Sequence, residues 1–358
     1  MKKILCFTDS LGSGGAQRQL VGLAIMLKER GYNVSVVLYH DIPFYTDVLI
    51  RNNIQIEIIK TGSNPIKRIL KFRKYFKSKN ANWVIAYQET PSLVAAVCRL
   101  FGCNYRLIVS ERNTTQSMGV NERVRFFLYR FADFIVPNSY SQSNFLENNY
   151  PWMKSKIKTI TNFVDFSEFY SVKRSCSKVP KILVVASASQ SKNLHGYIEA
   201  CRILKERNVK FTTEWYGLTD VITQYQSKAF ELIKNYYLGD IFKLLPKSIN
   251  IANKYREADY FCLPSFYEGT PNVLCEAIAM GLPVACSYVC DNPIYVENGV
   301  NGYLFNPNDS DDMANKIQKL ILLDNEKYQF YCENSEKIAH DKLEKETFLN
   351  KYLEILLV

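Results

Sequence analysis

Two glutamates flank a short turn that has the composition of an anion-binding helix start. Glu268 precedes the turn and Glu276 follows it, in the segment SFYEGTPNVLCE at residues 265–276. Thr270 suits a helix N-cap, and Pro271 suits the first helical position, where a missing N–H costs nothing. The backbone N–H groups at such a helix start favour an anionic group, above all a phosphate. The segment therefore predicts a phosphate site with two acids beside it.

The position of Glu276 on this predicted helix places its carboxylate at the edge of the buried face. The apolar stripe of the helix consists of Val273, Leu274, Ala277, Ile278 and Met280. Glu276 is three residues from Val273 and four from Met280, so it borders the stripe. A half-buried carboxylate needs donor groups, which a sugar or ribose diol supplies. Taken alone, these residues are as consistent with a helix-start acid plus an ordinary surface glutamate as with a ligand site.

The block from residue 258 to 309 resembles the signature region of glycosyltransferase family 4. The resemblance rests on the E-x7-E spacing of Glu268 and Glu276, on AIAMGLPVA at 277–285 and on ENGVNGYLFNPND at 297–309, and it extends over nearly the whole chain. Family members are retaining enzymes of the GT-B fold that use nucleotide-sugar donors. The resemblance implies that Glu268 is catalytic and orients the sugar hydroxyls. It also implies that Glu276 holds the ribose of the donor.

Further donor-side residues follow from the same resemblance. The helix-start turn that would bind the donor consists of Gly269, Thr270, Pro271, Asn272 and Val273. Lys192 matches a family lysine that clamps the diphosphate, and we expect it to act in catalysis. Ser187 stands where the family usually has an arginine, so the bidentate half of the clamp is missing. Without the resemblance, a solvated loop lysine is the better explanation of Lys192.

Two segments in the first half resemble the substrate loops of the family. The glycine turn SLGSGGAQRQL at 10–20 would place Gly14 and Gly15 beside the donor and Arg18 on the acceptor side. The third glycine of a dinucleotide fingerprint is replaced by Gln17, which argues against an NAD-dependent oxidoreductase.

The strand end IVSERN at 108–113 carries the remaining candidates for the acceptor or sugar side: Glu111, Arg112 and Asn113. Ligands gather at strand ends in open sheets of this type. Many relatives have a histidine here. This chain has only His40, His195 and His340, so a histidine-dependent nucleophile system is not expected.

Strand and helix patterns alternate along the chain, which predicts an α/β fold with doubly wound sheets. The strand candidates are 4–8, 34–38, 54–59, 83–87, 107–110, 134–137, 182–186, 211–216, 242–245, 260–263, 284–287 and 303–305. With the resemblance, this pattern predicts the GT-B architecture of two Rossmann-like domains facing each other across a cleft. We expect an N-terminal acceptor-side domain at 1–169 and a C-terminal nucleotide-sugar domain at 170–335. A final helix at 336–358 would cross back to the first domain, as the resemblance implies.

Composition narrows the class of protein. The chain has 358 residues, 47% hydrophobic and 22% charged, which is typical of a globular protein of about two domains. Ten scattered cysteines without a C-x-x-C pair predict free thiols in a reducing compartment. The N-terminal apolar run is too short for a signal peptide, and no run approaches bilayer-spanning length. We expect a cytoplasmic protein.

No residue pattern calls for a metal or a cofactor. Asp309 and Asp311 match a D-x-D metal motif superficially, but their place before a helical segment predicts helix capping instead.

The positive charge is concentrated in the first half. Residues 1–168 hold 23 Lys and Arg against 12 Asp and Glu, within a net charge of +10 for the chain. The densest cluster is a predicted amphipathic helix with Lys67, Arg68, Lys71, Arg73 and Lys74, whose apolar stripe runs from Ile66 through Ile69, Leu70 and Arg73 to Phe76. Such a face is either simply solvated or rests on anionic lipid at the inner face of the cytoplasmic membrane. No nucleic-acid module is recognisable.

These patterns together predict a retaining, metal-independent glycosyltransferase. It would move a sugar from a nucleotide-diphosphate sugar to a glycan or polyprenyl-linked glycan in surface polysaccharide synthesis. Two alternatives stay open: a GT-B nucleotide-sugar epimerase, and a non-catalytic glycan-binding or partner subunit, which the serine at 187 favours. The sequence does not identify the sugar, the base, the acceptor or the linkage.

Overall fold

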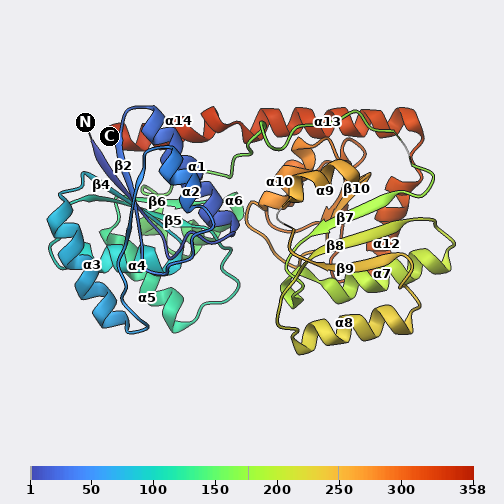
Figure 1. The fold of residues 1–358 in the computed structure, drawn as a ribbon, viewed down its shortest axis with the longest axis horizontal. Coiled ribbons are helices and arrows are strands. Elements are labelled where there is room, and N and C mark those ends of the chain that lie inside the picture. The colour runs from blue at the N-terminus through green and yellow to red at the C-terminus, as the bar shows by residue number, and fades with distance from the viewer. Residues whose placement is uncertain (1, 176, 249) are drawn as a thin grey trace. The chain divides into compact units, whose positions relative to one another are not determined.

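The computed structural model describes residues 2–175, 177–248 and 250–358 (Figure 1). Contacts divide the chain into two compact units. Unit 1 contains the residues up to Asn162 together with Glu346–Val358, and unit 2 contains Phe163–Lys345. The expected domain borders after residues 169 and 335 differ from this division, because residues 163–169 and the helix α13 (Asn325–Leu343) belong to unit 2.

Unit 1 is a six-stranded parallel sheet with helices on both faces. The strand order is β3-β2-β1-β4-β5-β6. Its elements are β1 (Lys3–Phe7), α1 (Gly15–Glu29), β2 (Asn33–Leu38), α2 (Thr46–Arg51), β3 (Gln55–Ile58), α3 (Pro65–Lys79), β4 (Trp83–Tyr87), α4 (Glu89–Leu100), β5 (Arg106–Glu111), α5 (Val120–Leu128), β6 (Phe134–Pro137), α6 (Tyr140–Asn149) and α14 (Lys345–Leu357). The last helix, α14, is tied to this unit by a 2.8 Å hydrogen bond between the hydroxyls of Tyr352 and Tyr87.

Unit 2 repeats the same design. Its six parallel strands have the order β12-β11-β10-β7-β8-β9. Its other elements are β7 (Lys181–Val185), α7 (Leu194–Glu206), β8 (Thr212–Leu218), α8 (Gln224–Asn235), β9 (Phe242–Pro246), α9 (Ile251–Glu257), β10 (Tyr260–Leu263), α10 (Asn272–Ala279), β11 (Val284–Ser287), α11 (Asn292–Tyr295), β12 (Gly302–Phe305) and α12 (Ser310–Ile321).

The predicted fold class is confirmed, because each of the twelve predicted strand segments overlaps one of the twelve strands in the described residues. The prediction succeeded since strands buried on both faces of a parallel sheet read as short continuous apolar runs. In each sheet the strand order reverses once, between β1 and β4 in unit 1 and between β7 and β10 in unit 2. Such switch points open a crevice at the carboxyl ends of the strands.

Arg174, which precedes β7 in the chain, is held against the rest of unit 2. Arg174 donates hydrogen bonds from its guanidinium to four backbone carbonyls, at Tyr255, Arg256, Ala258 and Met280. Burial lowers the pKa of this guanidinium. These hydrogen bonds anchor Arg174 to unit 2.

No helix among the described residues combines the length and the apolar character needed to cross a bilayer.

Candidate active site

The switch point of unit 2 brings together the loops that follow β7 and β10. The Lys192 ammonium lies 2.6 Å from Oε1 of Glu268. The backbone of the two loops is also joined, because the N–H of Phe266 donates to the carbonyl of Ser191 at 3.0 Å. The topology alone thus places the predicted catalytic lysine and glutamate in contact, although 76 residues separate them in the sequence.

Glu268 is held by a second donor that the sequence analysis did not identify. The Ser265 hydroxyl donates to the same oxygen, Oε1, at 2.6 Å, and Ser265 is completely buried. The side chains of Lys192 and Glu268 are 25% and 10% exposed, so both reach the surface of the crevice. Two donors on one oxygen fix the carboxylate orientation. In the sequence, only the position of Ser265, three residues before Glu268, could have indicated this contact.

The helix start that follows Glu268 differs slightly from the prediction. Pro271 is the N-cap, with extended backbone and no capping side chain, and α10 begins at Asn272 instead of at Pro271. Thr270 is buried and lies 3.5 Å from the Tyr295 hydroxyl, so its side chain faces α11 and does not cap the helix. Proline fixes its own φ and leaves ψ free to turn the chain into the helix, which explains the shift by one residue.

α10 ends at a glycine with left-handed backbone. Gly281 has φ of +71°, and a Schellman pair of hydrogen bonds joins Gly281 N–H to Ile278 and Leu282 N–H to Ala277, each at 3.0 Å. The first turn of α10 carries no acidic side chain and no side-chain cap. It remains suited to an anion by its dipole.

Glu276 is buried, with only 3% exposure, and not half-exposed at the helix edge as expected. Its Oε2 accepts a hydrogen bond from the Tyr255 hydroxyl at 3.0 Å. That hydroxyl also lies 3.1 Å from the Val273 carbonyl, which fixes α9 against α10. The periodicity placed Glu276 correctly beside the apolar stripe, but no sequence pattern pointed to Tyr255 as its partner.

The loop after β7 carries serines in place of a second cation. Ser187 is exposed and lies 3.1 Å from Ser189 through their hydroxyls, and Ser189 lies at the same distance from Ser191. Gly217 at the end of β8 supports this loop. A Cβ at Gly217 would lie 1.9 Å from the Ala186 carbonyl oxygen, so only a glycine allows β8 to lie this close to the loop after β7.

The glycine turn of unit 1 is organised by Asp9. One oxygen of Asp9, Oδ1, accepts from the Ser10 N–H at 2.6 Å and from the Gln17 amide at 3.0 Å. Gly14 is the N-cap of α1, and Gly15 is its first residue. Arg18 is half-buried, and its Nε donates to the Tyr45 hydroxyl at 3.3 Å. Gln17 therefore has a structural task within the turn.

Glu111 is enclosed inside unit 1. It accepts a hydrogen bond from the Tyr129 hydroxyl and pairs with the Arg125 guanidinium at 3.4 Å, and its side chain has no exposed surface. Arg125 reaches Glu89 at 2.9 Å with its other nitrogen. Burial raises the pKa of the Glu111 carboxyl, and the charge of Arg125 opposes this effect. Internal groups therefore surround this carboxylate.

Its neighbours in the sequence differ in exposure. Arg112 is 8% exposed, stacks over the Tyr87 ring at 4.9 Å and donates to the Asn162 side chain. Asn113 is exposed. Of these three candidates, only Asn113 presents a free side-chain surface at the strand end.

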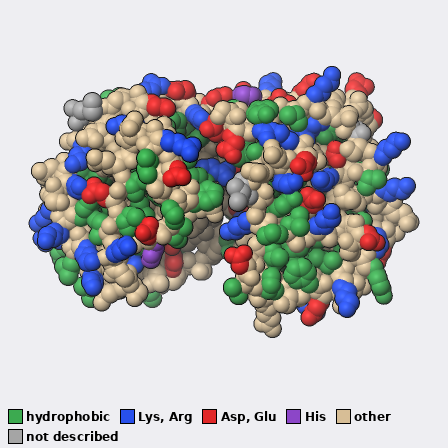
Figure 2. All heavy atoms as spheres, in the orientation of Figure 1, with side chains coloured by type: hydrophobic (Ala, Val, Ile, Leu, Met, Phe, Trp, Pro, Cys, Tyr) green, Lys and Arg blue, Asp and Glu red, His purple; other side chains and the backbone are tan. Residues whose placement is uncertain are grey.

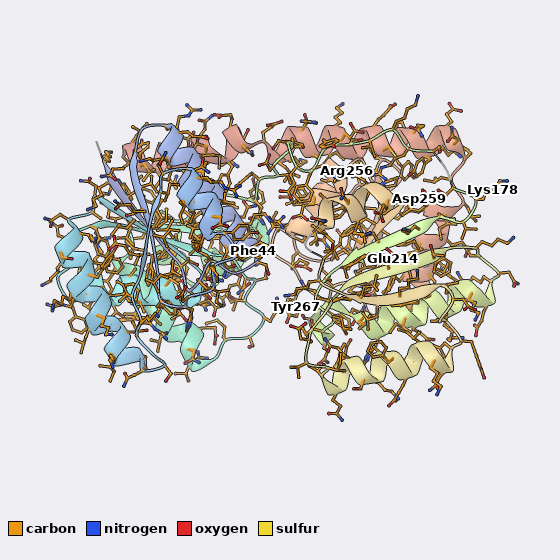
Figure 3. The ribbon with its side chains drawn as sticks, in the orientation of Figure 1. Phe44, Lys178, Glu214, Arg256, Asp259 and Tyr267 are labelled. Carbon is orange, nitrogen blue, oxygen red and sulfur yellow. The ribbon has the colours of Figure 1, made fainter. Side chains whose placement is uncertain are left out.

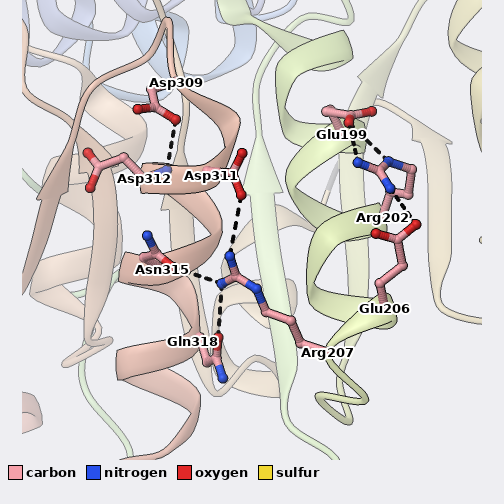
Figure 4. A network of polar contacts seen from close by, with 9 residues as sticks. All are labelled: Glu199, Arg202, Glu206, Arg207, Asp309, Asp311, Asp312, Asn315 and Gln318. Carbon is pink, nitrogen blue, oxygen red and sulfur yellow. Dashed lines mark hydrogen bonds and ion pairs between the residues drawn. The ribbon is translucent and has the colours of Figure 1, made fainter.

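The aspartates of the D-x-D sequence have structural tasks, as predicted (Figure 4). Asp309 caps α12 by accepting from the Asp312 N–H at 3.0 Å. Asp311 lies 3.4 Å from the Arg207 guanidinium. Within the described part of the chain, no group of three or more His, Cys, Asp or Glu side chains is arranged to hold a metal ion.

His195 is half-buried in unit 2. Its ring stacks on Tyr225 with centroids 3.8 Å apart, and its Nε2 lies 2.9 Å from the Tyr225 carbonyl oxygen.

The nine cysteines in the described residues are free thiols.

The basic helix α3 buries only part of the predicted apolar stripe: Phe76 is in the core and Ile69 packs against it, but Ile66 and Leu70 do not. Phe72 and Phe76 are buried, whereas Ile66 and Leu70 are 68% and 61% exposed. The exposed lysines of this helix are Lys67, Lys71, Lys74 and Lys77, and Figure 2 shows basic side chains gathered over the position of α3 in unit 1. Arg68 is partly withdrawn because it stacks over the Tyr39 ring at 4.2 Å. Arg73 donates to the Phe101 carbonyl at 2.9 Å.

Comparison with known families agrees with this geometry. Residues 166–338 match the family described as Glycosyl transferases group 1, and residues 13–168 match Glycosyltransferase Family 4. The chain belongs to the family 4 glycosyltransferases. The resemblance seen in the sequence is thereby confirmed.

Two relatives from Campylobacter jejuni cover most of the chain. One is named N-acetylgalactosamine-N,N'-diacetylbacillosaminyl-diphospho-undecaprenol 4-alpha-N-acetylgalactosaminyltransferase, and it is 26% identical over 80% of this chain and 81% of its own length. The other is named GalNAc-alpha-(1->4)-GalNAc-alpha-(1->3)-diNAcBac-PP-undecaprenol alpha-1,4-N-acetyl-D-galactosaminyltransferase, and it is 24% identical over 94% of this chain and 93% of its own length. The chain is thus a glycosyltransferase related to bacterial enzymes of polysaccharide biosynthesis.

Solved structures confirm the two-domain GT-B fold. Anabaena Alr3699/HepE in complex with UDP and glucose has a TM-score of 0.87 at 21% identity, with 99% of each chain covered. Sucrose-phosphate synthase from Thermosynechococcus elongatus has a TM-score of 0.83 at 17% identity, covering 99% of this chain and 98% of its own.

Proposed function

We propose that this family 4 glycosyltransferase retains the anomeric configuration, needs no metal, and transfers a sugar from a nucleoside-diphosphate sugar to a lipid-linked glycan. The observation that carries this proposal is the cluster of Lys192, Ser265 and Glu268 at the switch point of unit 2. A buried acid, Glu276, lies on the adjoining helix. Relatives that cover most of the chain have undecaprenol-linked acceptors in their names, which supports a lipid-linked acceptor here.

Each residue of the cluster has a distinct task in this mechanism. The Lys192 ammonium and the first-turn N–H groups of α10 would stabilise negative charge on the departing diphosphate. Glu268, fixed by Ser265, would hold hydroxyls of the donor sugar. Glu276 would bind the ribose from its place beside Tyr255. The remaining donor-side residues of the prediction, Gly269 and Asn272, line the same turn.

The stereochemical proposal follows from the balance of the reaction. The acceptor hydroxyl attacks the anomeric carbon on the face from which the diphosphate leaves, the C–O bond to the phosphate breaks, and a phosphate oxygen takes the acceptor proton. This route uses no protein carboxylate as nucleophile. Lys192 supplies positive charge to the leaving group, as a divalent cation does in other enzymes, which is why we propose metal independence.

The direct test is transfer by the full chain with a panel of UDP- and GDP-sugars in the presence of EDTA. An undecaprenyl-diphosphate-linked glycan serves as acceptor, and proton NMR of the product reports the anomeric configuration. We expect one donor to be consumed with retention. Inversion, or a strict requirement for a divalent cation, would contradict the mechanism. Turnover of the nucleotide sugar without acceptor would indicate an epimerase, and absent nucleotide-sugar binding a non-catalytic subunit.

We also propose that α3 contacts anionic lipid. Its exposed Lys67, Lys71 and Lys74 lie beside the exposed Ile66 and Leu70, which combines charge attraction with apolar insertion. Arg68 and Arg73 contribute less, because each is engaged with unit 1 itself.

Sedimentation with phosphatidylglycerol vesicles tests this contact. Changing Lys67, Lys71 and Lys74 to glutamine should remove most binding at low salt, and wild-type binding should fall as salt rises. The matched control changes three exposed lysines of unit 2, Lys210, Lys228 and Lys327, to glutamine. Equal loss in both variants would mean that only total charge matters, and α3 would then have no special role.

A further inference from the structure

One face of the edge strand β3 carries isoleucines that no helix fully covers. On the other face, Glu57 accepts from the Tyr75 hydroxyl at 3.0 Å and pairs with Lys79 at 2.7 Å, both from α3. Ile56 and Ile58 point the opposite way, because side chains alternate along a strand. The helix on that side, α2, has only six residues. Ile58 is left 40% exposed at the edge of the sheet.

A groove with a volume of about 600 Å³ lies beside these isoleucines. Leu38 and Ile54 are buried beneath it, while Ile42 and Ile50 stand at its sides, 50% and 60% exposed. Its volume falls within the range of small-molecule sites, and its lining is mainly aliphatic. Phe44, on the loop before α2, adds a further exposed apolar side chain next to it (Figure 3).

The groove continues from the glycine turn at the carboxyl edge of the sheet. Leu11 lines its inner end and precedes Gly12. A Cβ placed on Gly12 would touch the Ile42 side chain at 3.7 Å. Arg18, predicted on the acceptor side, is connected to the same loop through Tyr45. An elongated apolar ligand in the groove would therefore have its polar end near the predicted substrate residues.

The rim of the groove at the carboxyl end of β3 carries two lysines and one aspartate. Lys60 follows β3, its side chain is 80% exposed, and its ammonium lies 4.0 Å from the carboxylate of Asp41, which lines the groove. The Lys71 ammonium donates to the Lys60 carbonyl at 2.6 Å, so the basic face of α3 adjoins this rim. An aliphatic channel bordered by lysines is complementary to a lipid with a long hydrocarbon chain and an anionic head.

We propose that this groove binds the isoprenoid chain of a polyprenyl-diphosphate-linked acceptor. The inference rests on the proposed function, because it assigns the hydrocarbon part of the acceptor to a particular surface of unit 1. Aliphatic contacts hold the chain, and the lysines attract its phosphates. The isoprenoid chain binds in this groove whether or not the rest of the protein contacts a bilayer.

Calorimetric titration of the full chain with geranylgeranyl diphosphate, below its micelle concentration and without membranes, tests the proposal. The variant combines Ile50→Gln and Ile58→Gln, which changes two exposed side chains and should leave the thermal midpoint unchanged. We expect binding to the variant to be about tenfold weaker, since two aliphatic contacts are lost. Ile222→Gln is the matched control, because Ile222 is also an exposed isoleucine but lies in unit 2, where it is 45% exposed. This variant should bind geranylgeranyl diphosphate as the wild type does.

Two further probes separate the chain from its head and locate it. Inorganic diphosphate should bind the wild type and the double variant equally, because the lysines are unchanged. Geranylgeranyl diphosphate with a benzophenone at its far end should crosslink to residues within 42–58. Crosslinks confined to other segments, wild-type affinity in the double variant, or no binding to the wild type would each overturn the proposal.

The competing occupants give different results. If the double variant loses affinity for lipid vesicles but keeps it for soluble geranylgeranyl diphosphate, the surface rests on a bilayer and the proposal fails. If sedimentation shows that the wild type is a dimer and the variant a monomer, a second copy of the protein occupies the groove, and the proposal also fails. Binding of a nucleotide sugar is measured separately. If the wild type binds a nucleotide sugar but not geranylgeranyl diphosphate, this inference alone is rejected, whereas absent nucleotide-sugar binding to the wild type rejects the proposed function.

Discussion

Glu268 in unit 2 and Glu111 in unit 1 both stand at the carboxyl edge of a parallel sheet, and their surroundings differ in one decisive way. Oε1 of Glu268 accepts hydrogen bonds from Lys192 and Ser265, in a loop that reaches the surface. Glu111 is enclosed by Tyr129 and Arg125 and has no exposed surface. A carboxylate at a strand end is therefore a substrate residue only where the packing leaves it accessible. The comparison predicts that the first acid serves catalysis and the second serves stability.

The largest effect should come from Glu268→Gln. The substitution keeps the shape of the side chain but removes the charge that pairs with Lys192 and strengthens its hydrogen bonds to sugar hydroxyls. We expect the transfer rate to fall by about 10²- to 10³-fold, with a nearly unchanged thermal midpoint. Steady-state kinetics and calorimetry check both quantities. A rate loss matched by an equal loss of folded protein would assign Glu268 a structural task instead.

Arg125→Met tests the other side of the comparison. It leaves Glu111 buried without its cationic partner, and breaking such a pair typically costs about 3–5 kcal/mol. We expect a large fall in the free energy of unfolding, measured in urea. The KM for the nucleotide sugar should not change in the protein that remains folded. A selective rise of that KM with unchanged stability would place Arg125 at the substrate and contradict the contrast.

Ser265→Ala should have an intermediate effect. The alanine removes one of the two donors on Oε1 of Glu268 and leaves Lys192 in place. We expect kcat to fall about tenfold, while the affinity for the free nucleoside diphosphate stays the same, because the sugar and not the phosphate depends on this carboxylate. Ser335→Ala, which removes another buried serine hydroxyl of unit 2 that donates to the Leu282 carbonyl at 2.8 Å, serves as a control for general loosening. If it reproduces the kcat loss, Ser265 does not act by orienting Glu268.

The smallest effect concerns the pH dependence of stability. Burial raises the pKa of Glu111 in the folded protein, so the folded state holds a proton that the unfolded state has already released. Its contribution is fully present below the ordinary carboxyl pKa and is lost as pH rises through the raised value. The stability of the wild type relative to Glu111→Gln should therefore fall as pH increases above that ordinary value. A difference that grows with pH would show that Arg125 dominates over burial.

The sequence predicted the strands well because they depend on local patterns. Apolar runs mark strands that are buried on both faces of a parallel sheet. It did not predict the burial of Glu276 or its bond to Tyr255, because that contact joins two helices and leaves no periodic trace. The buried face of α3 was predicted only in part for a related reason. Phe72 packs inward although Ile66 and Leu70 fit the helical spacing equally well.

Predicted roles at strand ends had the same weakness. The motif at residues 108–113 marked the correct edge of the sheet, but only the positions of Tyr129 and Arg125 reveal that Glu111 is enclosed. Those partners lie 18 and 14 residues downstream, on α5 and the turn after it, and nothing in their local sequence indicates a carboxylate contact.

Calorimetric titration of nucleoside-diphosphate sugars against the wild type, Lys192→Ala and Glu276→Gln tests the donor site most directly. The account predicts that the wild type binds at least one donor, that Lys192→Ala weakens the diphosphate and the intact donor alike, and that Glu276→Gln weakens every ligand that contains the ribose. Equal affinities in all three proteins would contradict a donor site at the switch point of unit 2.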